Sequence, residues 1–348
     1  MTEAAPPALP LALRLPEAWP AGAAAAELPG GRLHLQHGPI DLVITVEAGA
    51  AARHRAIAVG LHRFAGILPG LAAELATLRQ QAISGAIPVA GPVARRMQHA
   101  VAPFAGDRFI TPMAAVAGAV ADHMATAMAA AAPLRRLIVN NGGDIALRLA
   151  PGETARLLLC TDPTPEGPVA SGAVEIGAGD GIAGIATSGW RGRSHSLGIA
   201  DAVTVFAESA ATADAAATLI ANAVDLPDAP ARIPYVTRSP ASSLAPESDL
   251  GDRLVTTRVA PLPQDLADAA LARGQALAAR FATAGHIRGA HLTLGEHTAI
   301  AGAPPPLARP APIAGRWLAG GRSKARDASP ATRERAPVRQ ALQKELSP

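Results

Sequence analysis

The order in which strand and helix patterns follow one another constrains the fold of this chain more than any other feature. Consecutive strands pair readily as antiparallel hairpins, whereas a doubly wound parallel sheet needs a helix after each strand. Here the strand patterns come in runs of two or more, at residues 31–37, 41–47, 134–140, 145–149, 155–160, 173–176, 182–186, 201–207, 249–256, 287–294 and 298–301. The sequence therefore predicts an α+β fold, with largely antiparallel or mixed sheets packed against helices.

Helical periodicity predicts four helices between these runs. The first is expected to be interrupted near Pro69, the second to begin at Thr111 as N-cap, and the third to be capped by Ser209 or Thr212. Aromatic residues are only 3% of the chain, while the apolar residues as a whole reach 49%, so the core must consist of Ala, Val, Leu and Ile. The predicted helices cover residues 50–80, 111–132, 209–223 and 264–283.

Charge is divided unevenly along the chain. The net charge is +3, but residues 304–348 carry nine basic and three acidic side chains, so the rest of the chain is acidic overall. This basic segment is rich in Pro and Arg, and we expect it to be disordered. We expect residues 1–27 to be a loosely ordered lead-in and residues 28–303 to form a single domain. Both lysines lie in the basic tail, which excludes a Schiff-base lysine from that domain.

Several partner classes are not expected. The chain start lacks a signal-peptide pattern, and the apolar stretch 113–132 carries Asp122 and His123 at its centre, which disfavours insertion into a membrane. We therefore expect a cytoplasmic protein without a membrane partner. The domain lacks aromatic stacking platforms and a basic face, so nucleic acid is not an expected partner. The sequence leaves the oligomeric state open.

Asp214 and Thr218 form the first candidate site. They are four residues apart in an alanine-rich helix, so their side chains share one helix face. A carboxylate and a hydroxyl are hard oxygen ligands that suit Mg²⁺. The structural alternative is that Asp214 favours the positive end of the helix dipole, while Thr218 bonds a backbone carbonyl.

Asn140-Asn-Gly-Gly-Asp144, at the end of a predicted strand, is the second candidate. Gly142 and Gly143 allow positive φ and close approach of a ligand, and Asn141 and Asp144 offer an amide and a carboxylate. The same residues also make a good hairpin turn, and both interpretations stay open.

Two further features concern Thr187-Ser-Gly189 and Asp122. Backbone amides of the first could form an anion-binding nest, with Arg191 and Arg193 nearby; the alternative is an exposed loop. Asp122 lies inside an apolar helix, where a buried acid either caps a loop or contacts a ligand.

Taken in order, these segments resemble the ApbE family of flavin transferases, the FAD:protein FMN transferase superfamily. The resemblance covers residues 110–225. Because the sequence lacks a lipoprotein signal, it is most similar to the soluble, poorly characterised branch of that family. It rests on Val116-Ala-Gly-Ala-Val-Ala-Asp122, Val139-Asn-Asn-Gly-Gly-Asp-Ile145, Ile185-Ala-Thr-Ser-Gly189, His195, Ala202-Val-Thr-Val205 and Ala213-Asp-Ala-Ala-Ala-Thr218.

This resemblance implies an ApbE-like, T-fold-related domain that binds FAD beside Mg²⁺ and transfers its FMN half to a threonine or serine of an acceptor protein. It implies Asp214, Thr218 and the main-chain carbonyl near Val116 as metal ligands, and His195 as a catalytic group that accepts the hydroxyl proton. The cofactor-binding residues implied are Asp122, Asn141, Gly142, Gly143, Asp144, Thr187, Ser188 and Gly189.

Two departures from the family pattern keep a second function open. Ala117 stands where the family usually has a lysine, and the family's long histidine segment is shortened to His195-Ser-Leu-Gly198. The intact Asp214 and Thr218 pair favours a flavin transferase. The departures favour a flavin- or nucleotide-binding protein without transferase activity.

Overall fold

Antiparallel strands dominate the structure, which is a computed structural model that describes residues 15–83, 88–106, 108–164, 167–192, 194–226 and 234–308. The strands are β1 (Ala23–Leu28), β2 (Arg32–His37), β3 (Ile40–Glu47), β4 (Arg136–Asn141), β5 (Asp144–Leu149), β6 (Thr154–Thr164), β7 (Gly167–Gly177), β8 (Gly184–Ser188), β9 (Ala202–Ala207), β10 (Val236–Pro240), β11 (Leu254–Val259), β12 (Gly289–Leu294) and β13 (His297–Gly302). Nine of them form one sheet in the order β1-β2-β3-β4-β5-β8-β9-β12-β13, and all neighbours in it are antiparallel. The predicted α+β fold is confirmed.

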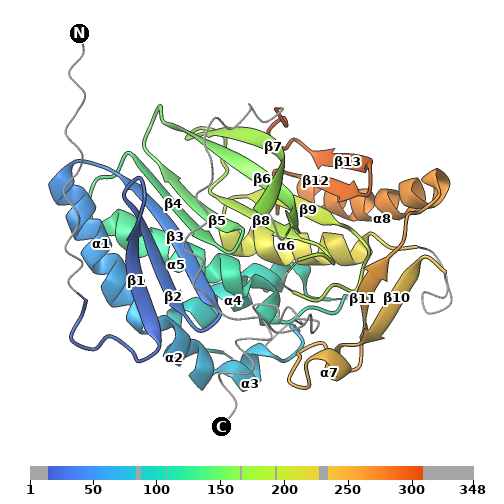
Figure 1. Cartoon of the computed structure of the whole chain (residues 1–348), viewed down its shortest axis with the longest axis horizontal. Helices are drawn as coiled ribbons and strands as arrows, with labels where there is room; N and C mark the ends of the chain where they lie inside the picture. Colours follow the sequence, from blue (N-terminus) through green and yellow to red (C-terminus); the bar gives the residue numbers. More distant parts are fainter. Residues whose placement is uncertain are drawn as a thin grey trace, which may run out of the picture.

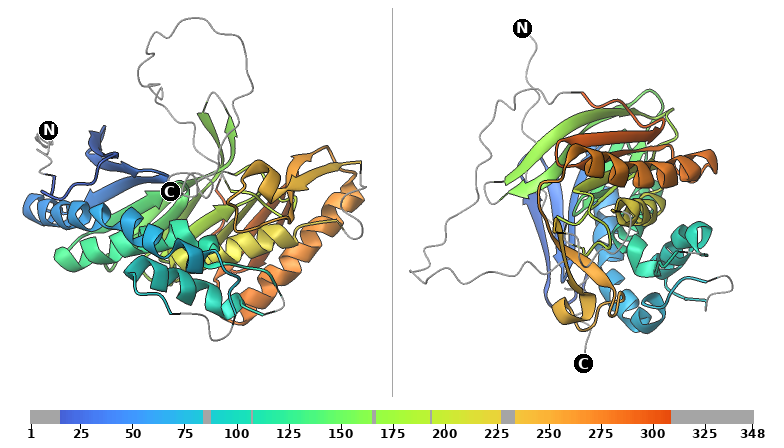
Figure 2. Two further views of the ribbon diagram at one scale, coloured as in Figure 1. Left: turned by 90° about the horizontal axis from the view of Figure 1, so that it is seen from below. Right: turned by 90° about the vertical axis from the view of Figure 1, so that its right-hand side faces the viewer.

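The main helices cover one face of this sheet (Figures 1 and 2). Helix α1 packs on β3, α5 on β4 and β5, α6 on β8 and β9, and α8 on β12 and β13. The helices are α1 (Ala50–Ala65), α2 (Ile67–Ala73), α3 (Leu75–Leu78), α4 (Pro92–Val101), α5 (Val116–Ala131), α6 (Ala210–Ala223), α7 (Ala241–Leu244) and α8 (Gln264–Thr283), with 3₁₀ turns η1 (Ala102–Phe104) and η2 (Pro112–Ala115).

Side chains alternate across the central strands, and the two faces differ in size of residue. Ala146 and Ala186 belong to the core shared with the helices, whereas their neighbours Ile145 and Ile185 join a separate cluster with Phe206. This second cluster is completed by the β6–β7 hairpin, which covers part of the opposite face of the sheet (Figure 2). On β5 and β8, small residues thus face the helices and large ones face the hairpin.

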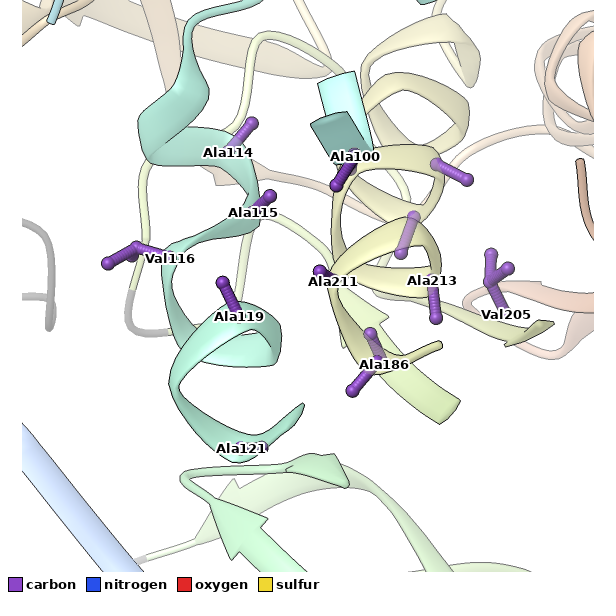
Figure 3. Packing of buried hydrophobic residues seen from close by; sticks show 14 of the residues in the cluster. Ala100, Ala114, Ala115, Val116, Ala119, Ala121, Ala186, Val205, Ala211 and Ala213 are labelled. Atoms are coloured by element: carbon purple, nitrogen blue, oxygen red, sulfur yellow. The ribbon is translucent and has the colours of Figure 1, made fainter. Parts of the chain in front are cut away.

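Helices α5 and α6 approach each other unusually closely. A β-carbon added at Gly118 would lie 2.2 Å from the carbonyl oxygen of Ala210, and one added at Gly184 would lie 2.0 Å from the Ala210 nitrogen. Figure 3 shows Ala119 of α5 and Ala211 of α6 on the sides where the two helices meet, whereas Ala213 lies on the side of α6 toward Val205. The aromatic-poor core is therefore what allows the two backbones to meet.

The expected lead-in, residues 1–27, needs a correction at its end, because Ala23–Leu28 forms strand β1. It pairs with β2 over its whole length and closes one edge of the sheet. A run of alanines has little intrinsic strand preference, so the strand depends on the hydrogen bonds that β2 offers. Residues 1–14 lie outside the described residues. So do residues 309–348 of the expected disordered tail, whose described beginning forms a bridge from Ala308 to Ala173.

Two predicted helix features are wrong in detail. The first helix breaks at Gly66 and at Glu74 rather than at Pro69, which sits in the first turn of α2, where its missing N–H leaves no acceptor unsatisfied. Thr111 does not cap the helix that follows it. Its hydroxyl instead donates to Asp249 Oδ2 at 2.5 Å, a contact between residues 138 apart in the sequence.

Besides β1 and the short turn η1, three elements have no counterpart among the sequence predictions, namely α4, β10 and α7. Helix α4 carries a helical signal that the sequence analysis missed, since Val93, Met97 and Ala100 share its buried face after a proline at its first position. Strand β10 and helix α7 are too short for such a signal, and among the described residues β10 pairs with β11 alone. Partners elsewhere in the chain, rather than local preference, stabilise such elements.

Two apolar helical stretches meet the length and composition of a membrane span, Ala50–Ala73 and Pro112–Ala131. Within the protein, 67% of the second window and 44% of the first are buried. The second stretch holds α5, which lies between the sheet and helices α1, α4 and α6. Its burial agrees with the prediction of a buried core helix at residues 113–132.

Candidate functional site

Two of the predicted loops lie at the same edge of the nine-stranded sheet. The β4–β5 hairpin turns at Gly142 and Gly143, which have φ values of 64° and 114°. Because β5 and β8 are antiparallel, with Ile145 opposite Ile185, the end of β8 at Ser188 reaches the edge where β5 begins. The tertiary structure therefore brings the double-glycine turn and the 187–189 loop to one edge, although each also has the hairpin or loop geometry of its structural alternative.

Asn141 joins this edge to the start of α5. Its side chain is buried, its amide Nδ2 donates to the carbonyl oxygen of Ala117 at 3.1 Å, and its Oδ1 accepts from the backbone N–H of Asp41 at 3.4 Å. The last residue of β4 thus holds the first turn of α5 next to the β4–β5 turn. Val116, whose carbonyl is a predicted metal ligand, directly precedes Ala117.

Asp214 contacts the same turn of α5 from α6. Its Oδ2 accepts a hydrogen bond from the backbone N–H of Gly118 at 3.1 Å, and the residue is 8% exposed. The contact needs glycine at position 118, because any β-carbon there would overlap the α6 backbone. The start of α5 therefore lies in contact with both Asn141 and Asp214. The metal-ligand roles of Asp214, Thr218 and the Val116 carbonyl stay predictions.

A row of three polar side chains runs along one face of α6. Thr218 follows Asp214 by one turn, and Asn222 follows Thr218 by another. Asn222 Oδ1 accepts hydrogen bonds from Leu197 N at 2.9 Å and from the Ser196 hydroxyl at 3.2 Å. Asn222 thus anchors the loop that contains the predicted catalytic residue His195, which directly precedes Ser196.

Sequence reasoning did not single out Asn222. The four-residue spacing after Thr218 was a signal for it, because residues at such spacing share a helix face. The spacing alone does not show which loop Asn222 would meet. Only the return of the chain after β8 brings residues 196 and 197 to the end of α6.

Asp122 occupies a different position from the other predicted cofactor-binding residues. It is 1% exposed, and its Oδ2 accepts from the backbone N–H of Ala211 at 2.9 Å, so it caps the start of α6 from α5. Burial raises the pKa of Asp122, against the opposing effect of its backbone hydrogen bonds and of Arg148, whose guanidinium lies 3.8 Å away. The contacts support the capping alternative for this residue.

The two helices therefore cap each other. Asp214 of α6 accepts from the first turn of α5, and Asp122 of α5 accepts from the first turn of α6. Each acid satisfies a backbone donor that has no partner within its own helix, and each lies at the positive end of the other helix. This reciprocal arrangement fixes the spacing of α5 and α6.

Three side chains of the segment 187–191 bind other residues of the protein. Thr187 Oγ1 lies 2.9 Å from Thr204 Oγ1 across two strands, and Asp201 accepts from Trp190 at 2.9 Å and from Arg191 at 2.6 Å. Arg193 lies outside the described residues. The backbone nest at 187–189 stays a prediction, and Ser188 and Gly189 remain its candidate donors.

The donor set fits a magnesium ion that also binds substrate phosphates. Among the described residues, no three His, Cys, Asp or Glu side chains are grouped so as to hold a metal ion. One carboxylate from Asp214, one hydroxyl from Thr218 and one backbone carbonyl from Val116 are a sparse set. Mg²⁺ commonly uses one or two carboxylates together with substrate phosphates and water, so these residues suit a site completed by a nucleotide.

Comparison with known proteins identifies several archaeal UPF0280 proteins as relatives of this chain. A UPF0280 protein of Methanopyrus kandleri is 43% identical over 131 residues, which are 37% of this chain and 48% of that protein. A UPF0280 protein of Methanothrix thermoacetophila is 40% identical over 141 residues, or 40% of this chain and 55% of that protein. The chain spans about half the length of these curated relatives.

Solved structures and a family model extend the comparison along the chain. The apo flavinyl transferase ApbE of Pseudomonas stutzeri aligns with 80% of this chain and 94% of its own, at 14% identity and a TM-score of 0.37. The flavin transferase ApbE of Vibrio cholerae covers 81% of this chain and 97% of its own, at 13% identity and the same TM-score. The family model described as AbpE bacteria matches residues 25–300. Because that match takes in most of the sequence, this chain belongs to the AbpE bacteria family.

Proposed function

We propose that this chain is a Mg²⁺-dependent flavin enzyme that binds FAD and transfers its FMN half to a threonine or serine of an acceptor protein. The observation that carries the proposal is the convergence of Asn141, the start of α5 and Asp214 at the sheet edge that also holds the double-glycine turn. The row of polar side chains on α6, Asp214, Thr218 and Asn222, leads from this point to the His195 loop.

Each residue has a defined part in the proposal. Asp214, Thr218 and the Val116 carbonyl would hold Mg²⁺, which when bound neutralises charge on the pyrophosphate. The acceptor hydroxyl oxygen bonds to the phosphorus of the FMN half, the pyrophosphate P–O bond breaks, and AMP leaves with the bridging oxygen. The hydroxyl proton passes to His195. Gly142 and Gly143 allow the flavin to approach the backbone, with Asn141 and Asp144 beside it.

The first experiment measures FAD retention by equilibrium dialysis, with and without millimolar Mg²⁺. We expect Mg²⁺-dependent retention in the wild type and a loss of at least about tenfold of the Mg²⁺ effect in Asp214→Asn, which is nearly isosteric. Asp265→Asn, an exposed acid in the first turn of α8, is the matched control and should bind as the wild type does. Absence of FAD retention at any Mg²⁺ concentration would refute the proposal.

A flavin- or nucleotide-binding role without transfer is the second candidate. It is favoured by the absence of the usual family lysine, since Ala117 stands in that place. The carbonyl oxygen of Ala117 accepts a hydrogen bond from Asn141. Incubation with FAD and an acceptor peptide containing D-G-x-T or D-G-x-S separates the two. An FMN mass addition that His195→Ala abolishes supports transfer; FAD binding without any mass addition supports the second candidate.

Localisation in the cytoplasm is part of the same proposal. Fractionation of cells that express the full chain provides the test, with recovery in the membrane pellet as the contrary result.

A further inference from the structure

A cavity on the helical side of the protein lies apart from the residues of the candidate site. It has a volume of about 190 Å³ and is enclosed by the end of α1, by α2, by the first turn of α4 and by His123 of α5. The cavity exists because the chain breaks at Gly66, so that α2 turns away from α1 instead of continuing it. In the left view of Figure 2, the helices of this region, coloured blue to teal, lie on the same face of the sheet.

The lining has an apolar part and a basic part. Ile67, Leu71 and Val93 supply buried apolar surface, while the ionisable residues that line the cavity are His62, Arg63 and His123. No acidic residue is among those that line it. A pocket of this composition is complementary to a ligand with an apolar body and one negative charge.

Glu74, an acid that contacts the cavity-lining residue Gly91, is already engaged. Glu74 accepts hydrogen bonds from the backbone N–H groups of Ala90 and Gly91, at 2.5 Å and 2.9 Å. Its carboxylate caps the start of α4 and does not pair with the basic residues of the pocket. The positive charge of Arg63 is therefore available to a ligand.

His123 is a half-buried, neutral group in the cavity wall. Its pKa is lowered to about 4, first by burial and then by the charges of Arg96 and Arg63, so its ring is neutral at pH 7. Burial disfavours a charge of either sign, so the attraction for an anion comes from the two arginines alone. A neutral imidazole also donates one hydrogen bond, which a carboxylate oxygen accepts.

We propose that this cavity binds a small amphipathic monocarboxylate, with its apolar body against Ile67, Leu71 and Val93 and its carboxylate beside Arg63 and His123. The volume corresponds to roughly six water molecules, which matches a chain of about six carbons. A dinucleotide is far too large for it, so the ligand is distinct from FAD. The site goes beyond the proposed flavin chemistry and does not depend on it.

Isothermal titration with hexanoate tests the proposal, with hexanol and acetate as separate probes of the apolar body and of the charge. Hexanoate is expected to bind the full chain with a Kd of about 1 mM or tighter, and at least about fivefold more tightly than either comparison ligand. Two-dimensional NMR should show the His123 ring signals shifting with hexanoate concentration.

A cavity-filling variant checks the location. Gly70 lines the cavity, and an added β-carbon there meets no atom within 4 Å, so Gly70→Leu places an apolar side chain at the cavity wall and favours the helix. It should weaken hexanoate binding at least about tenfold, whereas Ala73→Leu, at an exposed position of the same helix, should not. Arg63→Gln should weaken binding about threefold.

Three results would overturn the proposal. These are no saturable hexanoate binding, equal binding of hexanol and hexanoate, and unchanged binding in Gly70→Leu. Circular dichroism and the urea unfolding midpoint of Gly70→Leu show whether the variant is folded, and this control does not depend on flavin binding.

Discussion

Replacing Gly118 with alanine should force apart the two helices that build the candidate site. The added methyl group would lie 2.2 Å from Ala210 O and 2.7 Å from Ala211 N, and β-carbons essentially never make contacts under 3.0 Å. Both neighbours are backbone atoms, so no side chain can rotate away. The helices must separate by about 1 Å to restore ordinary contact distances.

The energy can be estimated against a matched variant. Overpacking of this kind costs roughly 3 kcal/mol, and the better helix propensity of alanine offsets up to about 1 kcal/mol of that. Gly70→Ala, where an added methyl group meets nothing within 4 Å, carries only the second effect. We expect Gly118→Ala to be about 2 kcal/mol less stable than the wild type and Gly70→Ala to be at least as stable.

Urea unfolding followed by circular dichroism measures both variants. Separation of the helices also lengthens the bond from Gly118 N to Asp214, so Gly118→Ala should lose Mg²⁺-dependent FAD retention in conditions where it is still folded. Equal stability of Gly118→Ala and Gly70→Ala would refute the tight approach of α5 and α6. A destabilised variant with intact Mg²⁺ dependence would instead separate the helix contact from the metal site.

Three further predictions concern caps and buried ionisable groups. Asp122→Ala leaves the Ala211 N–H without an acceptor and should cost about 1–3 kcal/mol in urea unfolding. Because burial raises the folded pKa of Asp122 above 3.8, this carboxyl lowers stability as pH rises through that raised pKa, and Asp122→Asn should remove this part of the acid-range profile. The pKa of His123 is about 4 in the folded protein, against 6.5 for a free histidine, so unfolding takes up a proton between these pH values. The free energy of unfolding should therefore fall as the pH drops from 6.5 to 4. His123→Asn should flatten this slope, and an unchanged slope would contradict the assignment. Ser209→Ala removes the side chain that caps α6 through Thr212 N and should lower thermal stability by about 1 kcal/mol, whereas Thr212→Ala keeps the backbone donor and should cost less.

Some elements are predictable because their signals are local. The turn at Gly38 between β2 and β3 and the Ser209 cap of α6 follow from residues within a few positions of one another. The last helix has the predicted bounds, Gln264–Thr283, because its apolar period is long and unbroken. Strand β1 lacks such signals, and its formation depends on pairing with β2, which the local pattern does not identify. Helix α4 has a local signal in the spacing of Val93, Met97 and Ala100, which the sequence analysis overlooked.

The candidate site divides in the same way. The shared helix face of Asp214 and Thr218 follows from their spacing, and the double glycine indicates a turn wherever it lies. Whether Asp122 caps or binds was open in the sequence, because both interpretations need the same buried acid. Its bond to Ala211, 89 residues away, is decided by the packing of α5 on α6.

By itself, the sequence determined the class of the fold, the helix that carries Asp214, and a core of small side chains. These properties depend on the order of short patterns and on composition, which a linear chain already displays. Only the tertiary structure decided that Gly118 meets Asp214 across 96 residues, that Asn141 holds Ala117, and that Asn222 holds the loop of His195. Each of these contacts joins residues that lie far apart in the chain. They depend on how the helices, strands and loops pack against one another, and no local sequence pattern encodes that packing.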